Sequence, residues 1–114
     1  MSPADLDLLE RRLGLALPAG YRALLLESAT FPDHDYFLHD AARLLELNGR
    51  WRRISGWKAS WVAIGEGFEG DVYFIDTAAD PPAVYVRGAD GGVEVWMPTL
   101  AELAAALRTR RGRA

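Results

Sequence analysis

The sequence predicts an α+β fold: an N-terminal helical hairpin and a C-terminal helix packed on an antiparallel β-sheet meander of about four to six strands. Three observations lead to this prediction. Leucines recur at helical spacing near both ends of the chain, and short β-branched or aromatic segments follow one another between residues 61 and 96. The connections between those segments are too short for helical crossovers, so neighbouring strands should run antiparallel.

Capping residues mark the helical hairpin at the N-terminus. Ser2 can cap a helix that has Pro3 at its first position and Asp5 three residues after the cap, and Gly14 ends that helix. Its apolar face holds Leu6, Leu9 and Leu13. Pro18 can begin a second helix, whose buried face is expected to hold Tyr21, Leu24, Leu25 and Ser28.

The middle of the chain predicts one further helix and the strands. A short strand is expected at Tyr36–Leu38, followed by a helix at Ala41–Leu47 that Asp40 caps and Asn48 and Gly49 close. The strands of the meander are predicted at Trp61–Ile64, Val72–Asp76, Val84–Val86 and Val93–Trp96.

A second capping box, formed by Thr99 and Glu102, opens the final helix. Its apolar side holds Leu100, Leu103 and Leu107. Residues 108–114 are rich in arginine and are expected to form a basic, frayed tail. No linker interrupts the 114 residues, so residues 1–114 are expected to form a single domain.

Composition excludes several classes of function. The chain has no cysteine, which removes disulfides, thiolate metal sites and cysteine nucleophiles. It has no apolar run of about 18 residues, and its first residues favour a helix start over a signal peptide, so a cytoplasmic protein without membrane contact is expected. The net charge is −3, and residues 59–86 hold five carboxylates without Lys or Arg, which disfavours direct nucleic-acid binding.

The glycine pattern at residues 65–70, Gly-Glu-Gly-Phe-Glu-Gly, matches a phosphate-binding motif by letter. The dinucleotide form of that motif needs a helix after the glycines, whereas Val72–Asp76 predicts a strand. The kinase form needs catalytic motifs that the chain lacks. We therefore interpret the segment as a hairpin loop shaped by left-handed glycines.

Two groups of polar residues could bind metal, but neither has the spacing of a known site. Glu66, Glu69 and Asp71 lack the spacing of a calcium loop, and an exposed loop offers no apolar pocket for acid catalysis. The histidines in 33–35 and 39–40 match no common metal signature and are expected to be surface residues. No metal, no cofactor and no catalytic residue is therefore expected.

The segment 50–61 mixes three tryptophans with basic residues, which allows two interpretations. Single-strand nucleic-acid binders use such mixtures as stacking platforms. Alternatively, the tryptophans cover an edge of the core and the arginines lie over them, or the segment forms a protein-binding surface.

The order of these motifs resembles the SUKH superfamily, which includes the yeast Smi/Knr cell-wall-assembly regulators and many bacterial immunity proteins. The matching features are the segment L-G-L-A-L-P with Tyr21, the pattern W-x-x-I-G from Trp61, the pattern G-D-x-Y-x-I-D from Gly70, and the C-terminal helix. This resemblance spans nearly the whole chain. It implies an α+β binding domain without known catalytic residues.

The resemblance also implies a function and a set of site residues. Relatives of this size are cytoplasmic immunity proteins that bind and neutralise a cognate toxin, often a nuclease or a nucleic-acid-modifying enzyme. The residues expected to contact the partner are Glu66, Phe68, Glu69, Asp33 and Asp35. Those expected to serve the fold are Trp61, Gly65, Gly70, Asp71 and Tyr73, with the Asp71 carboxylate tying the loop. A monomer or weak homo-oligomer is expected.

Two other classes of function stay open at the level of sequence. The same fold could serve as an intracellular adaptor or regulatory binding module that has several weak protein partners and no toxin. An enzyme or ligand-binding domain would instead require a deep pocket or a carboxylate with a strongly shifted pKa.

Overall fold

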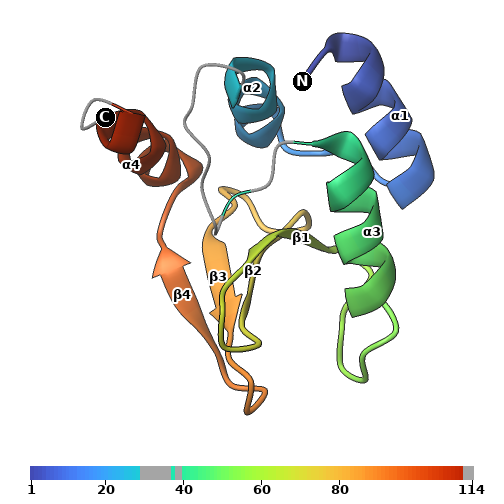
Figure 1. The fold of residues 1–114 in the computed structure, drawn as a ribbon, viewed down its shortest axis with the longest axis vertical. Helices are drawn as coiled ribbons and strands as arrows, with labels where there is room; N and C mark the ends of the chain where they lie inside the picture. The colour runs from blue at the N-terminus through green and yellow to red at the C-terminus, as the bar shows by residue number, and fades with distance from the viewer. Residues whose placement is uncertain (29–36, 38–39, 112–114) are drawn as a thin grey trace.

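The computed structural model describes residues 1–28, 37 and 40–111 of the chain, with side chains described up to residue 108. Figure 1 shows the elements in chain order. They are α1 (Pro3–Leu13), α2 (Ala19–Glu27), α3 (Ala41–Trp51), β1 (Trp61–Glu66), β2 (Val72–Asp76), β3 (Val84–Arg87), β4 (Val93–Met97) and α4 (Leu100–Arg111). The predicted α+β class and the C-terminal helix are confirmed.

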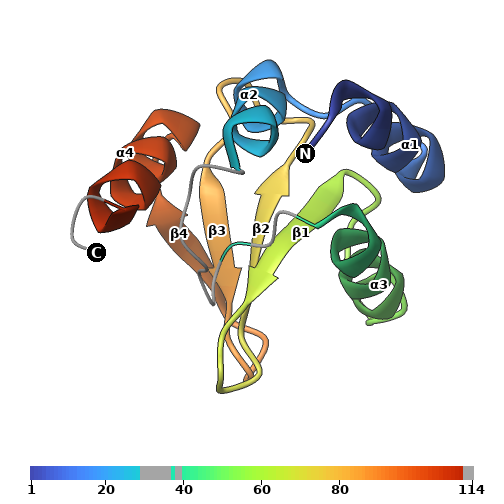
Figure 2. The ribbon, with the colours of Figure 1, turned by 45° about the horizontal axis from the view of Figure 1, so that its top comes forward.

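The four strands form one antiparallel sheet in the order β1-β2-β3-β4, which confirms the predicted meander. Figure 2 shows α1 and α2 above the sheet, α4 beside β4 and α3 beside β1. The main core lies between the helices and one face of the sheet. On the sheet side it contains Val62, Ile64, Tyr73, Ile75 and Val84, and on the helix side mainly the leucines of α1, α2 and α4.

The opposite face of the sheet carries a second, smaller core. Leu47 of α3 packs there on the strand residues Ala63 and Val72, and two tryptophans border the cluster. Because α3 contributes Leu44 to the main core and Leu47 to this cluster, the helix straddles the β1 edge of the sheet.

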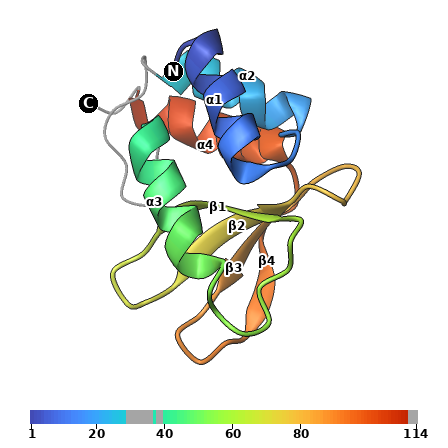
Figure 3. The same cartoon turned by 90° about the vertical axis from the view of Figure 1, so that its right-hand side faces the viewer.

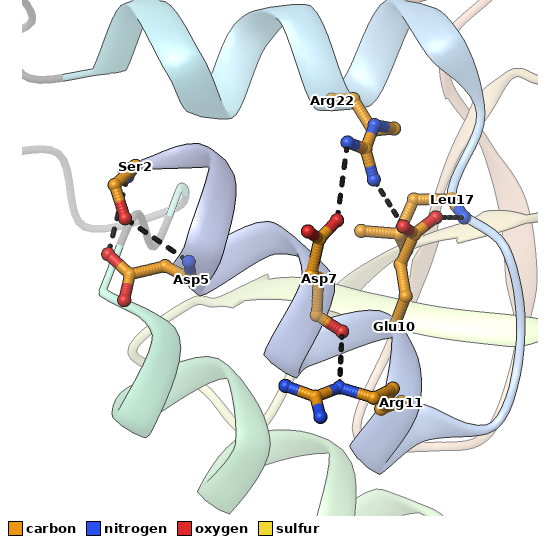
Figure 4. A network of polar contacts seen from close by, with 7 residues as sticks. All are labelled: Ser2, Asp5, Asp7, Glu10, Arg11, Leu17 and Arg22. Atoms are coloured by element: carbon orange, nitrogen blue, oxygen red, sulfur yellow. Dashed lines mark hydrogen bonds and ion pairs between the residues drawn. The ribbon is translucent and has the colours of Figure 1, made fainter.

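The helical hairpin begins and turns as the sequence predicts. Ser2 and Asp5 form the reciprocal capping box, and Gly14 ends α1 in the left-handed region at φ 74°. Glu10 then joins the two helices, as Figure 4 shows: one carboxylate oxygen accepts the Leu17 N–H at 2.7 Å, and the other pairs with the Arg22 guanidinium. This half-buried ion pair fixes the turn between α1 and α2.

The predicted end of the third helix is wrong. The helix continues through Asn48 and Gly49 to Trp51, because the Asn48 side chain is not a terminator but a buried bridge. Its amide nitrogen donates to the Leu44 and Ala63 carbonyls at 2.9 and 3.0 Å, and its amide oxygen accepts the Ala63 N–H at 2.8 Å. Those bonds require Asn48 to stay on the helix.

Other boundaries differ less. Strands β1, β3 and β4 each extend beyond the predicted ends, while β2 has the predicted bounds. Thr99 accepts the Glu102 N–H at 3.1 Å, as expected of a helix cap. The predicted strand at Tyr36–Leu38 lies outside the described residues except for Phe37, which is buried and not in a strand.

The basic tail is helical where the structure describes it. Arg108 lies in α4, and its guanidinium donates two hydrogen bonds to the Glu27 carboxylate, at 2.6 and 2.7 Å. Residues 112–114 lie outside the described residues. None of the helices in the described part of the chain is long and apolar enough to cross a membrane.

Tyr21 offers a first test of this core. Its ring is fully buried, edge-on to Phe37, and burial raises the pKa of its phenol; its hydroxyl has no hydrogen-bond partner among the described residues. A buried hydroxyl without a partner destabilises the fold, so Tyr21→Phe is expected to raise the free energy of unfolding by about 1 kcal/mol. Urea unfolding of both proteins measures the difference. A clear loss of stability would show instead that the hydroxyl is bound in solution.

Candidate functional site

Two hairpin loops lie next to each other at the end of the sheet farthest from α1, α2 and α4 (Figures 1 and 3). One loop joins β1 to β2 at residues 67–71, and the other joins β3 to β4 at residues 88–92. They touch closely: a Cβ placed on Gly70 would lie 3.5 Å from the Ala89 Cβ. We refer to these loops and the strand ends beside them as the two-hairpin end.

A hollow of about 430 Å³ opens between the loops. Its lining residues are Glu69, Asp71, Val86, Gly88, Ala89, Asp90, Gly92, Val93 and Glu94. Four of them carry carboxylates and none is basic. Arg87, the nearest arginine in sequence, does not line the hollow: its guanidinium lies over the Trp51 ring, 5.4 Å from its centre, and 3.6 Å from where a Cβ on Gly91 would be. Four carboxylates without a lining cation favour a negative potential in the hollow.

Two of the four carboxylates also shape their own loops. The Asp71 carboxylate accepts the Glu69 N–H at 3.3 Å, and a Cβ at Gly67 would collide with it. In the same way the Asp90 carboxylate accepts the Gly92 N–H at 2.9 Å. The Asp90 bond, to the residue two positions later, is an Asx turn, whereas the Asp71 bond reaches back across its loop.

The side chains of Glu69 and Glu94 are different. Neither carboxylate makes a hydrogen bond or an ion pair within the described part of the chain. Glu69 comes from the first loop and Glu94 from β4, yet both line the same hollow. They are the two carboxylates best placed to meet a cationic group of a partner.

The structure separates the predicted partner-binding residues. Glu66 is turned toward α3, where its carboxylate binds the Arg50 guanidinium at 2.9 Å and lies 3.4 Å from the Trp51 indole nitrogen. The hydrogen bond between Arg50 and Glu66 raises the pKa of the Arg50 guanidinium. Glu69 faces the hollow instead, and Phe68 is 81 % exposed at the tip of the loop. Asp33 and Asp35 lie outside the described residues.

Sequence reasoning missed Asp90 and Glu94, because it considered only the acidic stretch before residue 87. The signal was present in the predicted topology. In an antiparallel meander the first and third hairpin loops lie at the same end of the sheet, so the residues 88–94 had to lie near the loop 67–71.

The residues expected to serve the fold have the following positions. Trp61 stacks on Phe74 with ring centres 4.3 Å apart, and Tyr73 packs in the main core. Gly65 lies in β1 at a register shift, and of the glycines at residues 65–70 only Gly70 is left-handed, at φ 83°. The expectation of several left-handed glycines in this loop is therefore wrong: β1 extends through Gly65, where the backbone is extended.

The tryptophans of segment 50–61 lie on the face of the sheet opposite the main core. Trp51, Trp57 and Trp61 form a continuous ring cluster with Phe74 and Tyr85. This arrangement favours the interpretation that they cover an edge of the core. The cations over the rings are Lys58 and Arg87. They are not the arginines expected from the sequence, since Arg50 pairs with Glu66 and Arg52 donates to the Leu13 carbonyl.

The described part of the chain holds no cluster of side chains that could bind a metal ion. No three His, Asp or Glu residues there converge on a common point, the carboxylates of the hollow included. What the arrangement offers chemically is electrostatic: a concave acidic surface with exposed apolar residues beside it, as protein interfaces have.

Comparison with known proteins agrees with the fold and its motifs. The family model of the SMI1 / KNR4 family (SUKH-1) matches residues 1–106. No curated protein and no solved structure matches the chain. The matched segment includes every helix and strand up to α4 and the whole two-hairpin end. The chain belongs to the SMI1 / KNR4 (SUKH-1) family.

Proposed function

We propose that this protein is a cytoplasmic immunity protein that binds a cognate bacterial toxin and neutralises it. The toxin is a nuclease or another enzyme that acts on nucleic acid. Family membership supports a binding domain of this kind. The observation that carries the proposal further is the two-hairpin end, where four carboxylates line one hollow without a basic residue among them.

The chemistry of the target explains the choice of toxin. An enzyme that binds nucleic acid has a basic cleft that matches the phosphate backbone. The two-hairpin end presents carboxylates to such a cleft, which speeds association through long-range attraction and then blocks access of the substrate. Phe68, exposed at the tip of the first loop, provides an apolar anchor of the type that dominates binding energy at interfaces.

The first experiment is co-expression with the product of the adjacent open reading frame. If the proposal is right, that product arrests growth when expressed alone, growth is restored by this protein, and the two co-purify as a complex. Substituting an unrelated acidic protein of similar size controls for charge alone. A toxic neighbour that is not rescued and not bound would contradict the proposal, and several weak partners without toxicity would favour an adaptor.

Salt dependence provides a second measurement on the same complex. Electrostatic steering is screened by ions, so the association rate should fall steeply between low and physiological ionic strength while the dissociation rate changes little. Stopped-flow mixing measures both rates. An association rate independent of salt would remove the acidic surface from the mechanism.

A further inference from the structure

The two edges of the sheet differ in their hydrogen bonding. At the β1 edge, the Asn48 side chain bonds both the N–H and the carbonyl of Ala63, as a neighbouring strand would. At the other edge, β4 pairs with β3 only, and no described strand lies on its outer side. Figure 2 shows β4 at the margin of the sheet, with α4 near its C-terminal end.

The register shows which backbone groups of β4 are available. The Gly88 N–H donates to the Gly92 carbonyl at 2.9 Å, and hydrogen-bonded and non-hydrogen-bonded pairs alternate along an antiparallel ladder. Counting from the bonded pair Gly88–Gly92, the next bonded pair is Val86–Glu94. Val93 and Val95 are in non-bonded pairs, so their N–H and carbonyl groups point away from β3. Within the described residues, nothing bonds to these outward groups.

The strand also lacks lysine and proline, two residues that commonly protect an edge. Natural sheets block open edges with lysine and other charged residues, proline, bulges or a covering element, and of these β4 has Glu94 and the register shift beside Trp96. The β4 sequence, Val-Glu-Val-Trp-Met, contains neither lysine nor proline. Its two valines are 46 % and 54 % exposed, at positions 93 and 95. Among the described residues, the exposed backbone and valines at positions 93 and 95 therefore leave a short stretch of this edge accessible to a second extended segment.

The two faces beside the edge have different chemistry. Val95 is paired with Tyr85, whose ring stacks on Phe74 in the aromatic cluster, so one face is apolar. On the other face, Glu94 lines the acidic hollow. Its partner on β3 is Val86, which packs against the main core. A strand sends alternate side chains to opposite faces. The best ligand for this edge thus alternates apolar and basic residues.

We propose that β4 receives an extended segment of the partner as a fifth strand, and that this segment alternates basic and apolar residues. The inference rests on the proposed function for the source of the segment, a basic toxin. Its basic side chains lie over the hollow near Glu69, Asp90 and Glu94, and its apolar ones lie beside Val93 and Val95. A second copy of this chain fits less well, because β4 has Glu94 as its only charge and cannot complement itself.

A register shift between β3 and β4 limits the length of the new ladder. Val84 pairs with Met97 and Tyr85 with Val95, so Trp96 is an extra residue that bends β4. Pairing is therefore confined to residues 93–95. Side-chain complementarity must supply most of the selectivity, which makes the alternating pattern the property to test.

The test uses peptides, so that it does not depend on the identity of the toxin. An eight-residue peptide of alternating Lys and Val is titrated into the full-length protein, and amide hydrogen exchange is followed by NMR. We expect exchange at Val93 and Val95 to slow by about tenfold or more at saturation. The matched control is a peptide of alternating Glu and Val, which should bind at least about tenfold more weakly.

Two variants separate the backbone from the charge. Val95→Pro removes an outward N–H that β3 does not use, and it is expected to abolish the slowed exchange at Val93. Glu94→Lys keeps every backbone group of the edge and should shift the binding preference toward the Glu–Val peptide. This variant keeps the proposal testable if the proline variant fails to fold. Equal binding of both peptides, unchanged exchange at β4, or slow exchange without peptide through self-association would each overturn the proposal. Failure of growth rescue with intact peptide binding would instead overturn only the assignment to a toxin.

Discussion

Asn48→Leu is expected to lower the free energy of unfolding by about 3 to 5 kcal/mol. Leucine has the same Cγ-branched skeleton as asparagine but is larger, so it adds strain at this fully buried position, and the buried N–H and carbonyl of Ala63 both lose their partner. Each unsatisfied buried group costs about 1 to 3 kcal/mol. Small domains have only about 5 to 15 kcal/mol in total, so the loss is a large fraction of the stability. Urea unfolding followed by tryptophan fluorescence measures it.

The next residue provides a matched control of opposite sign. Gly49 is in the interior of α3, and a Cβ there would meet no atom within 4 Å. Gly49→Ala should therefore raise the free energy of unfolding by about 0.5 to 1 kcal/mol, the usual gain for alanine over glycine in a helix. If both substitutions lowered stability by similar small amounts, the bridge from Asn48 to β1 would not be significant.

The second large effect concerns the partner. Reversing both unpaired carboxylates of the hollow, Glu69→Lys with Glu94→Lys, is expected to weaken toxin binding by roughly 30- to 150-fold, which corresponds to about 2 to 3 kcal/mol. Like charges are then opposed across the interface, whereas the fold keeps all its hydrogen bonds because neither carboxylate takes part in one among the described residues. Isothermal titration or surface plasmon resonance measures the affinity, and circular dichroism checks the fold.

Two other acidic residues serve as controls for that experiment. Glu46 is exposed on α3 and does not line the hollow, so Glu46→Lys should leave affinity within about twofold. Glu66→Lys breaks the pair with Arg50, so any loss of affinity there would report a change at α3 rather than at the hollow. A double reversal no weaker than Glu46→Lys would remove the two-hairpin end from the interface.

Local patterns in the sequence predicted much of the fold, because the responsible interactions are local. The Ser2 cap, the left-handed Gly14 and the Val72–Asp76 strand depend on residues only a few positions away. The end of α3 could not be predicted in this way. Asn48 has the sequence character of a helix terminator, and only its contact with Ala63, 15 residues later, makes it a helical residue.

The candidate site, too, could be predicted only in part from the sequence. The acidic character of Glu66 to Glu69 is visible in the sequence, but their directions are not. Glu66 faces α3 because Arg50 and Trp51 lie within reach of its carboxylate, and Glu69 faces the hollow. The sequence by itself determined the elements, the family pattern and the sign of the charge, since these follow from periodicity and composition. Tertiary structure alone decided which carboxylates gather and which sheet edge lacks a neighbour among the described residues, because both depend on contacts between segments far apart in the chain.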